Sequence, residues 1–134
     1  SAHVVTVAQQ KGGSGKTTLA AQIAAAWSAE GQRTALIDIY PQASLATWFQ
    51  RRTEWDGAPV HTLHLSKVAG WRIAAEIDRL RRDFDAVIVD SPPHAETETR
   101  TAVRAADLVL IPVQPSPMDL WATQPTLEMA RKEK

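Results

Sequence analysis

Several features that would point to particular classes of protein are missing from this chain of 134 residues. It has no cysteine, which excludes disulfides, thiolate metal sites and cysteine nucleophiles. Its 15 lysines and arginines equal its 15 aspartates and glutamates, so the whole chain carries no basic field of the kind that attracts nucleic acid. No apolar run approaches the roughly 20 residues of a membrane span, and the N-terminus has no charged-then-apolar signal pattern. We therefore expect a cytoplasmic globular protein without a membrane partner.

Short apolar runs alternate along the chain with segments of helical periodicity. The predicted strands are His3–Ala8, Thr34–Ile39, Val60–Leu65, Ala86–Asp90 and Leu108–Val113, and the predicted helices are Thr17–Ala29, Ser44–Arg52, Trp71–Arg82 and a last one from Pro117 to Lys134. This alternation is typical of an α/β fold, in which a mostly parallel, twisted sheet carries helices on both faces. We expect residues 1–134 to form a single domain. Because the chain ends on a charged helix without a closing strand, we also expect the natural domain to continue into further C-terminal elements.

A glycine-rich turn lies between the first predicted strand and the first predicted helix. From residue 10 it reads Gln10, Lys11, Gly12, Gly13, Ser14, Gly15, Lys16, Thr17, Thr18. Glycines let backbone N–H groups turn inward around an anion, and the N-terminus of the following helix adds partial positive charge. In such a loop the lysine neutralises the β- and γ-phosphates, and the next hydroxyl is a Mg²⁺ ligand. The turn predicts a P-loop that binds ATP or ADP with Mg²⁺, rather than a plain strand-to-helix connection.

The loop departs from the standard P-loop, because Gln10 occupies the place of the usual first glycine and an extra lysine, Lys11, follows it. It resembles the deviant Walker A motif of the ParA/MinD family, whose pattern KGGxGKT is matched from Lys11 to Thr17. The resemblance implies a P-loop NTPase-like fold. It also implies that Lys11 reaches across a nucleotide-sandwich homodimer to the phosphates bound by the other subunit. The alternative for Lys11 is an ordinary solvated surface lysine.

The segment LIDIYPQ, from Leu36 to Gln42, resembles the switch I motif of the same family, IDxDPQ. Asp38 matches the first aspartate, which the resemblance places near Thr17 and the Mg²⁺ shell. Tyr40 stands where the family has a second aspartate, whose carboxylate orients the attacking water. Tyrosine, with a pKa of about 10, offers neither a charge nor a base at neutral pH. We predict intact nucleotide binding and a weak ATPase.

Three interpretations of Tyr40 remain open. It is an engineered or mutated position that traps the ATP-bound state, a natural variant that hydrolyses slowly, or a neutral substitution for which another residue compensates. The candidate catalytic residues are Lys11, Lys16, Asp38 and Tyr40.

A third segment, DAVIVDSPP from Asp85 to Pro93, resembles the Walker B and switch II motifs, DxxxxDxPP. A carboxylate at the end of a buried strand can reach the metal shell through a water molecule, which makes Asp90 the candidate; its alternative is a cap on the next turn. The candidate metal ligands are Thr17, Asp38 and Asp90. A fourth segment, DLVLIPVQPSPMDL, is also similar to the family and begins at Asp107.

The resemblance implies an ATP-dependent dimerisation switch for DNA partition or intracellular positioning. Such a protein binds nonspecific DNA as an ATP-bound dimer on the nucleoid and is released by a ParB-like activator. One alternative is a metabolic synthetase on the same fold, similar to dethiobiotin synthetase or the cobyrinate amidases, which do not need the trans lysine. Another is a binding-only nucleotide module without turnover. Two clusters of arginines form either local DNA patches or ordinary solvated helix faces: Arg51 and Arg52, and Arg72, Arg79, Arg81 and Arg82.

Overall fold

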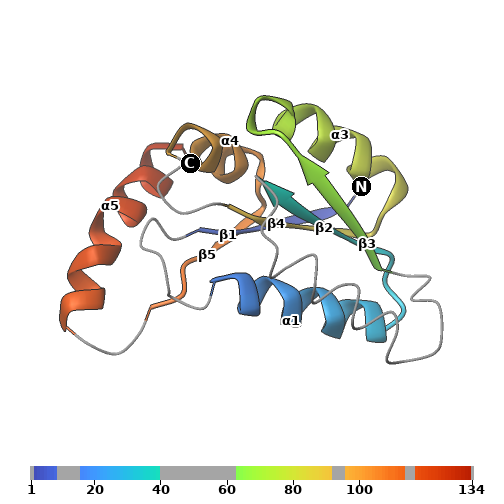
Figure 1. Cartoon of the computed structure of the whole chain (residues 1–134), viewed down its shortest axis with the longest axis horizontal. Helices are drawn as coiled ribbons and strands as arrows, with labels where there is room; N and C mark the ends of the chain where they lie inside the picture. Colours follow the sequence, from blue (N-terminus) through green and yellow to red (C-terminus); the bar gives the residue numbers. More distant parts are fainter. Residues whose placement is uncertain (1, 9–15, 40–62, 92–95, 114–116, 134) are drawn as a thin grey trace.

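A computed structural model describes residues 2–8, 16–39, 63–91, 96–113 and 117–133. Within these ranges a single parallel sheet has the strand order β3-β2-β4-β1-β5. The strands are β1 (His3–Val7), β2 (Thr34–Ile39), β3 (Leu63–Val68), β4 (Ala86–Asp90) and β5 (Leu108–Leu110). The predicted parallel sheet is confirmed, and β1 lies inside it between β4 and β5 (Figure 1).

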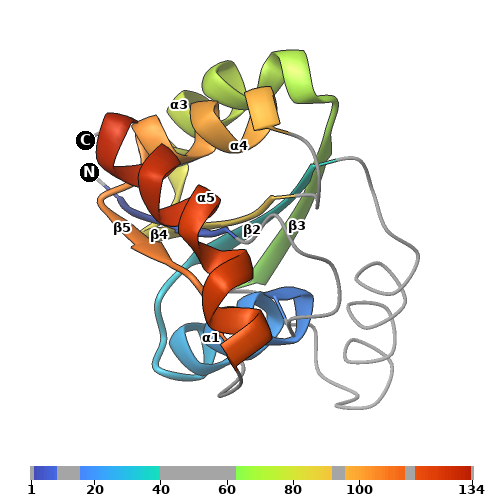
Figure 2. The ribbon, with the colours of Figure 1, turned by 90° about the vertical axis from the view of Figure 1, so that its left-hand side faces the viewer.

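Helices cover both faces of this sheet. One face carries α1 (Lys16–Ala29), and the other carries α3 (Ile73–Asp83) and α4 (Glu96–Ala105). A short 3-10 turn, η1 (Gly70–Arg72), leads into α3. The last helix, α5 (Pro117–Glu133), packs against α4 (Figures 1 and 2). Among the described residues, no helix combines the length and the apolar character that a membrane crossing requires.

The strands contribute alternate residues to two separate cores. Towards α1 they present Val7, Leu36 and Ile88, which pack against the small side chains of Ala20, Ala21 and Ala24. Towards α3 and α4 the strands present the opposite set of residues. Val4, Ile37, Ile39, Val87 and Val89 pack against the large side chains of Ile73, Ile77 and Leu80 on α3 and against Ala102 on α4. Burial on both faces explains why β2 and β4 appear in the sequence as continuous apolar runs rather than as alternating ones.

Two predicted strand boundaries are wrong by more than one residue. β3 runs from Leu63 to Val68 instead of ending at Leu65, because its pairing follows β2 along the whole length of that strand, from Thr34 to Ile39. β5 stops at Leu110 instead of Val113, since its only partner in the described part of the chain is β1, and their pairing ends at Val7. The predicted helix at residues 44–52 lies outside the described residues.

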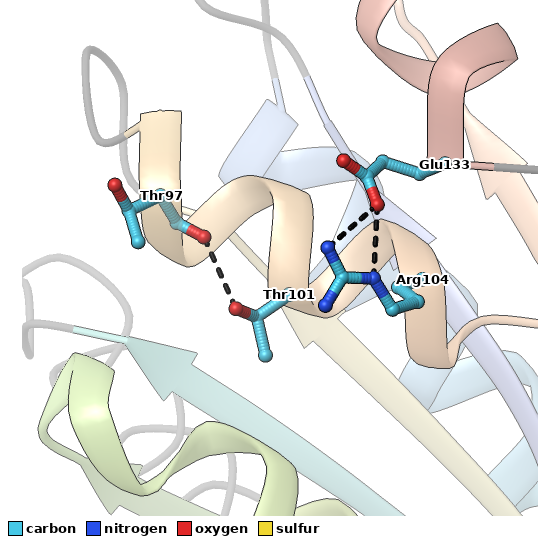
Figure 3. Close-up of polar contacts among 4 residues, drawn as sticks. All are labelled: Thr97, Thr101, Arg104 and Glu133. Atoms are coloured by element: carbon cyan, nitrogen blue, oxygen red, sulfur yellow. Dashed lines mark hydrogen bonds and ion pairs between the residues drawn. The ribbon is translucent and has the colours of Figure 1, made fainter.

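Helix α4 was not predicted, although it joins several parts of the fold. The buried hydroxyl of Thr6 on β1 donates a 2.8 Å hydrogen bond to the carbonyl of Ala102. At the other side of the helix, Arg104 forms an ion pair with Glu133 at the end of α5, with 2.8 Å between Nη2 and Oε2 (Figure 3). Because the Arg104 side chain is 68% exposed, this pair contributes less than about 1 kcal/mol. Packing, rather than this pair, holds α4 in place.

Candidate functional site

Three neighbouring strands end together at the carboxyl edge of the sheet. In the pairing of β2 with β4, Asp38 lies opposite Asp90, and in the pairing of β1 with β4, Val7 also lies opposite Asp90. Figure 1 shows that α1 begins beside this edge and runs back beneath the sheet. The ends of β1, β2 and β4 and the first turn of α1, at Lys16, are therefore brought to one place.

The side chains of Asp38 and Asp90 lie on the same face of the sheet. Leu36 and Ile88 both belong to the core under α1, and each aspartate follows two residues later on its strand. Since side chains alternate along a strand, both carboxylates share the α1 face, on strands about 4.8 Å apart. Asp38 is 0% exposed and Asp90 is 1% exposed. Two adjacent buried carboxylates are a costly arrangement that a fold tolerates where they are partnered or bind a cation, and both do have polar partners in the structure.

The structure describes only some of the residues that the sequence predicts at this site. Asp38 and Asp90, which are 52 positions apart in the chain, are brought together. Lys16, Thr17 and Thr18 form the first turn of α1, and their side chains lie outside the described part. The remaining candidates lie outside the described residues altogether: Lys11, Gly12, Gly13, Ser14, Gly15 and Tyr40.

The donor set at this edge suits a magnesium ion held jointly with phosphate. Mg²⁺ prefers oxygen ligands and is usually bound through one or two carboxylates together with substrate phosphates and water. Asp38 and Asp90 provide two carboxylates side by side. In the ranges that the structure describes, this edge included, no three or more His, Cys, Asp or Glu side chains gather as a metal cage would require.

Ser91 is a residue at this site that the sequence did not indicate. Its side chain is fully buried, and its hydroxyl donates a 2.9 Å hydrogen bond to the carbonyl of Val7. The bond ties the first residue after β4 to the last residue of β1. No local pattern predicts it, because it depends on β1 and β4 being neighbours in the sheet.

Replacing Ser91 with alanine is expected to lower the free energy of unfolding by about 1 kcal/mol, because it removes a buried hydrogen bond. Urea unfolding curves measure the change, provided that the dependence of the unfolding free energy on urea concentration has the same slope in both proteins. Thr101→Val is the matched control, since it removes a hydroxyl that donates to a backbone carbonyl, that of Thr97, at an exposed position (Figure 3). We expect the control to lower the free energy of unfolding by about half as much or less. Equal losses in the two variants would show that burial adds nothing to the Ser91 hydrogen bond.

A parallel sheet with a glycine-rich segment between β1 and α1, and with two carboxylates at the adjoining strand ends, defines a P-loop nucleotide-binding fold. The family model described as ATPase MipZ matches residues 3–124 of the chain. The chain belongs to this family, within the ParA/MinD type of ATPases.

Curated relatives agree with that assignment. The maintenance of carboxysome distribution protein A of Halothiobacillus neapolitanus is 36% identical over 132 residues, covering 96% of this chain and 58% of the relative. Protein ParA of Rhizobium radiobacter is 32% identical over 130 residues, covering 97% of this chain and 57% of the relative. The chain thus spans somewhat more than half the length of these relatives.

Solved structures share the fold at low sequence identity. Apo McdA of Cyanothece has a TM-score of 0.79 at 22% identity, covering 98% of this chain and 66% of that one. The pNOB8 ParA bound to nonspecific DNA has a TM-score of 0.74 at 22% identity, covering 95% and 58%. A cobyrinic acid a,c-diamide synthase of Mycobacterium smegmatis has a TM-score of 0.78 at 22% identity, covering 98% and 68%. At this identity the likeness concerns the fold alone.

Proposed function

We propose that this chain is the nucleotide-binding part of a ParA-type switch, which dimerises on MgATP and serves DNA partition or intracellular positioning. The observation that supports this best is the placement of Asp38 and Asp90, buried side by side on the face where α1 begins. The KGGxGKT pattern from Lys11 to Thr17 supplies the phosphate-binding half of the same site. A membership in the MipZ family agrees with both.

Each candidate residue has a distinct task in this proposal. The backbone N–H groups of residues 11–15 and the N-terminus of α1 bind the phosphates, and Lys16 neutralises their charge. Thr17 and Asp38 would hold Mg²⁺, and Asp90 would act on the ion through a water molecule. When bound, Mg²⁺ draws charge from the phosphates. Lys11 contacts the phosphates held by the partner copy, so that dimerisation requires the triphosphate.

The proposal assigns weak hydrolysis to this chain. The P-loop residues, Asp38 and Asp90 are all retained for binding, whereas a tyrosine, Tyr40, occupies the position from which a carboxylate would orient the attacking water. ATP is then chiefly a ligand that favours the dimer over the monomer, and its effect equals the difference in its affinity for the two states.

The same proposal implies two partners for the whole protein, namely DNA and an activator of hydrolysis. The pNOB8 relative is described bound to nonspecific DNA, and we propose that the whole protein to which this chain belongs binds DNA likewise as an ATP-bound dimer on the nucleoid. We further propose that a ParB-like activator ends that state by stimulating hydrolysis.

The synthetase alternative has one observation in its favour, since the cobyrinic acid a,c-diamide synthase matches the fold as well as the ParA-type structures do. That enzyme is described with a bound ATP analogue and magnesium. Lys11 separates the two functions, because a synthetase has no use for a lysine acting in trans. A synthetase would also release phosphate only when a carboxylate substrate is added, which a ParA-type protein does not need.

The mass of the protein in solution tests the proposal. Light scattering is expected to give a monomer without nucleotide and with ADP, and a dimer with MgATP. Lys11→Ala is expected to stay monomeric with MgATP. At protein concentrations low enough to keep the unchanged chain monomeric as well, the two are expected to bind ATP with affinities within about threefold of each other, because the variant removes only the interaction with the other subunit. An unchanged mass in all three nucleotide states would overturn the sandwich dimer. A Lys11→Ala dimer of normal affinity would assign the lysine to the solvated surface.

A further inference from the structure

A second cationic site lies at the opposite edge of the sheet, where the strands begin. There an open cleft of about 450 Å³ is lined by three arginines and four other residues. Arg33 precedes β2, whereas Arg81 and Arg82 form the last turn of α3. The N-terminus and the end of α3 lie together at this edge, away from the start of α1 (Figure 1). None of these residues belongs to the candidate nucleotide site.

The three arginines of this cleft are not neutralised within it. In the part of the chain that the structure describes, no carboxylate forms an ion pair with the side chain of Arg33, Arg81 or Arg82. The one acidic residue in the lining, Asp85, accepts a 2.9 Å hydrogen bond from the backbone N–H of Arg33. The lining therefore holds three guanidinium charges against one carboxylate.

Arg81 has a guanidinium group whose hydrogen-bonding capacity is only partly used. Its Nη2 donates to the carbonyl of Ala105, but its Nε is buried and finds no hydrogen-bond acceptor among the described residues. A buried, charged donor without a hydrogen-bond partner destabilises the fold. An anion bound in the cleft would reduce this destabilisation, since it places negative charge beside a guanidinium that is already partly shielded from water.

The side chain of Arg33 contacts an aromatic ring beside the cleft. Its guanidinium lies 5.8 Å from the ring centroid of Phe84. The same ring stacks against His64, at 5.6 Å between centroids and 23° between planes. Phe84 follows α3 directly, so this contact places Arg33 in the same cleft as the arginines of the last helical turn. Such a contact reduces the entropy that an arginine loses when it binds a ligand.

We propose that this cleft binds the phosphate groups of a ligand. Arginine matches phosphate oxygens with paired hydrogen bonds, and three of them without carboxylate partners stand out in a chain of zero net charge. The phosphates come either from the backbone of duplex DNA or from a small phosphorylated compound. The proposal does not rest on the ATP switch, because the cleft and the start of α1 lie at opposite edges of the sheet.

Pyrophosphate is the probe for the cleft itself. In ¹⁵N-labelled protein it is expected to shift the backbone amides of Arg33 and Asp85, and Arg82→Glu is expected to weaken that response about tenfold. Arg131→Glu is the matched control, because Arg131 is likewise an exposed arginine in the last turn of a helix. Lys16→Ala is expected to abolish shifts around the P-loop alone, which separates failure of the nucleotide site from failure of the cleft.

Fluorescence anisotropy of labelled duplex DNA at several salt concentrations shows whether the bound phosphate groups come from DNA or from a small compound. If DNA is the ligand, Arg82→Glu lowers the affinity about tenfold and reduces the salt slope by about 0.9 for each phosphate that the protein no longer neutralises, whereas Arg131→Glu changes the affinity less than twofold. Pyrophosphate shifts without a specific DNA effect assign the cleft to a small phosphorylated compound. The proposal is overturned if neither probe responds to Arg82→Glu, or if Arg131→Glu has the same effect.

Discussion

Replacing Tyr40 with aspartate is expected to raise the rate of ATP hydrolysis by about 10²–10⁴-fold, the range in which a positioned general base contributes. The site would otherwise remain unchanged, because Asp38 and the P-loop residues are retained. The new carboxylate would orient the attacking water, a task that a neutral phenol does not perform near pH 7. Phosphate release at saturating ATP and Mg²⁺ measures the rate per site.

The matched control for this change is Tyr40→Phe, which removes only the phenolic hydroxyl. Its rate is expected to stay at the low level of the unchanged chain. If Tyr40→Asp is no faster than Tyr40→Phe, another residue limits hydrolysis and the interpretation of this position is wrong. Light scattering of the same samples supplies a second readout, since faster hydrolysis is expected to shorten the lifetime of the ATP-bound dimer.

The second large effect is expected at the two carboxylates of the sheet edge. Asp38→Asn or Asp90→Asn is expected to weaken ATP binding in the presence of Mg²⁺ by about 10–100-fold, the range found when groups around a bound metal are altered. Without Mg²⁺ the change is expected to be less than about threefold. An amide keeps the shape of the carboxylate but loses its charge, so the metal-dependent part of the affinity is affected first. Calorimetric titrations with and without Mg²⁺ separate the two contributions.

Asp85→Asn is the matched control for Asp90→Asn, because both aspartates belong to the same short motif. Asp85 lies just before β4 at the opposite edge, where it is exposed and accepts a hydrogen bond from the backbone of Arg33. Its replacement is expected to change Mg²⁺-dependent ATP affinity less than twofold. Equal losses for the two variants would show a general effect on the strand and would remove Asp90 from the metal shell. Unfolding curves of all variants check that the fold is retained.

Helix α4 shows where prediction from the sequence failed and why. Its sequence, ETETRTAVRA, has only three apolar residues, Ala102, Val103 and Ala105, and three of its ten residues are threonines. Threonine has a low helix propensity, so the segment does not stand out as a helix although its polar and apolar residues are segregated on opposite faces. Tertiary packing stabilises the helix instead, through its contacts with α3 and α5. The packing is close, since a Cβ added to Gly70 would collide with Cγ of Glu98. α1, α3 and α5 were predicted because longer apolar or helix-forming stretches mark them.

The sequence alone determined the local chemistry of this protein. The glycines and lysines of residues 11–18, the aspartates at the ends of apolar runs and the substitution at Tyr40 can all be interpreted from neighbouring residues, because turn conformation and side-chain periodicity are short-range properties. The tertiary structure alone decided which strand ends meet. Strand order and register place Asp38 beside Asp90, Ser91 against Val7, and Arg33 at the end of α3. These contacts join segments about 50 or more positions apart, and they exist only because long-range pairing and packing fold the chain back on itself.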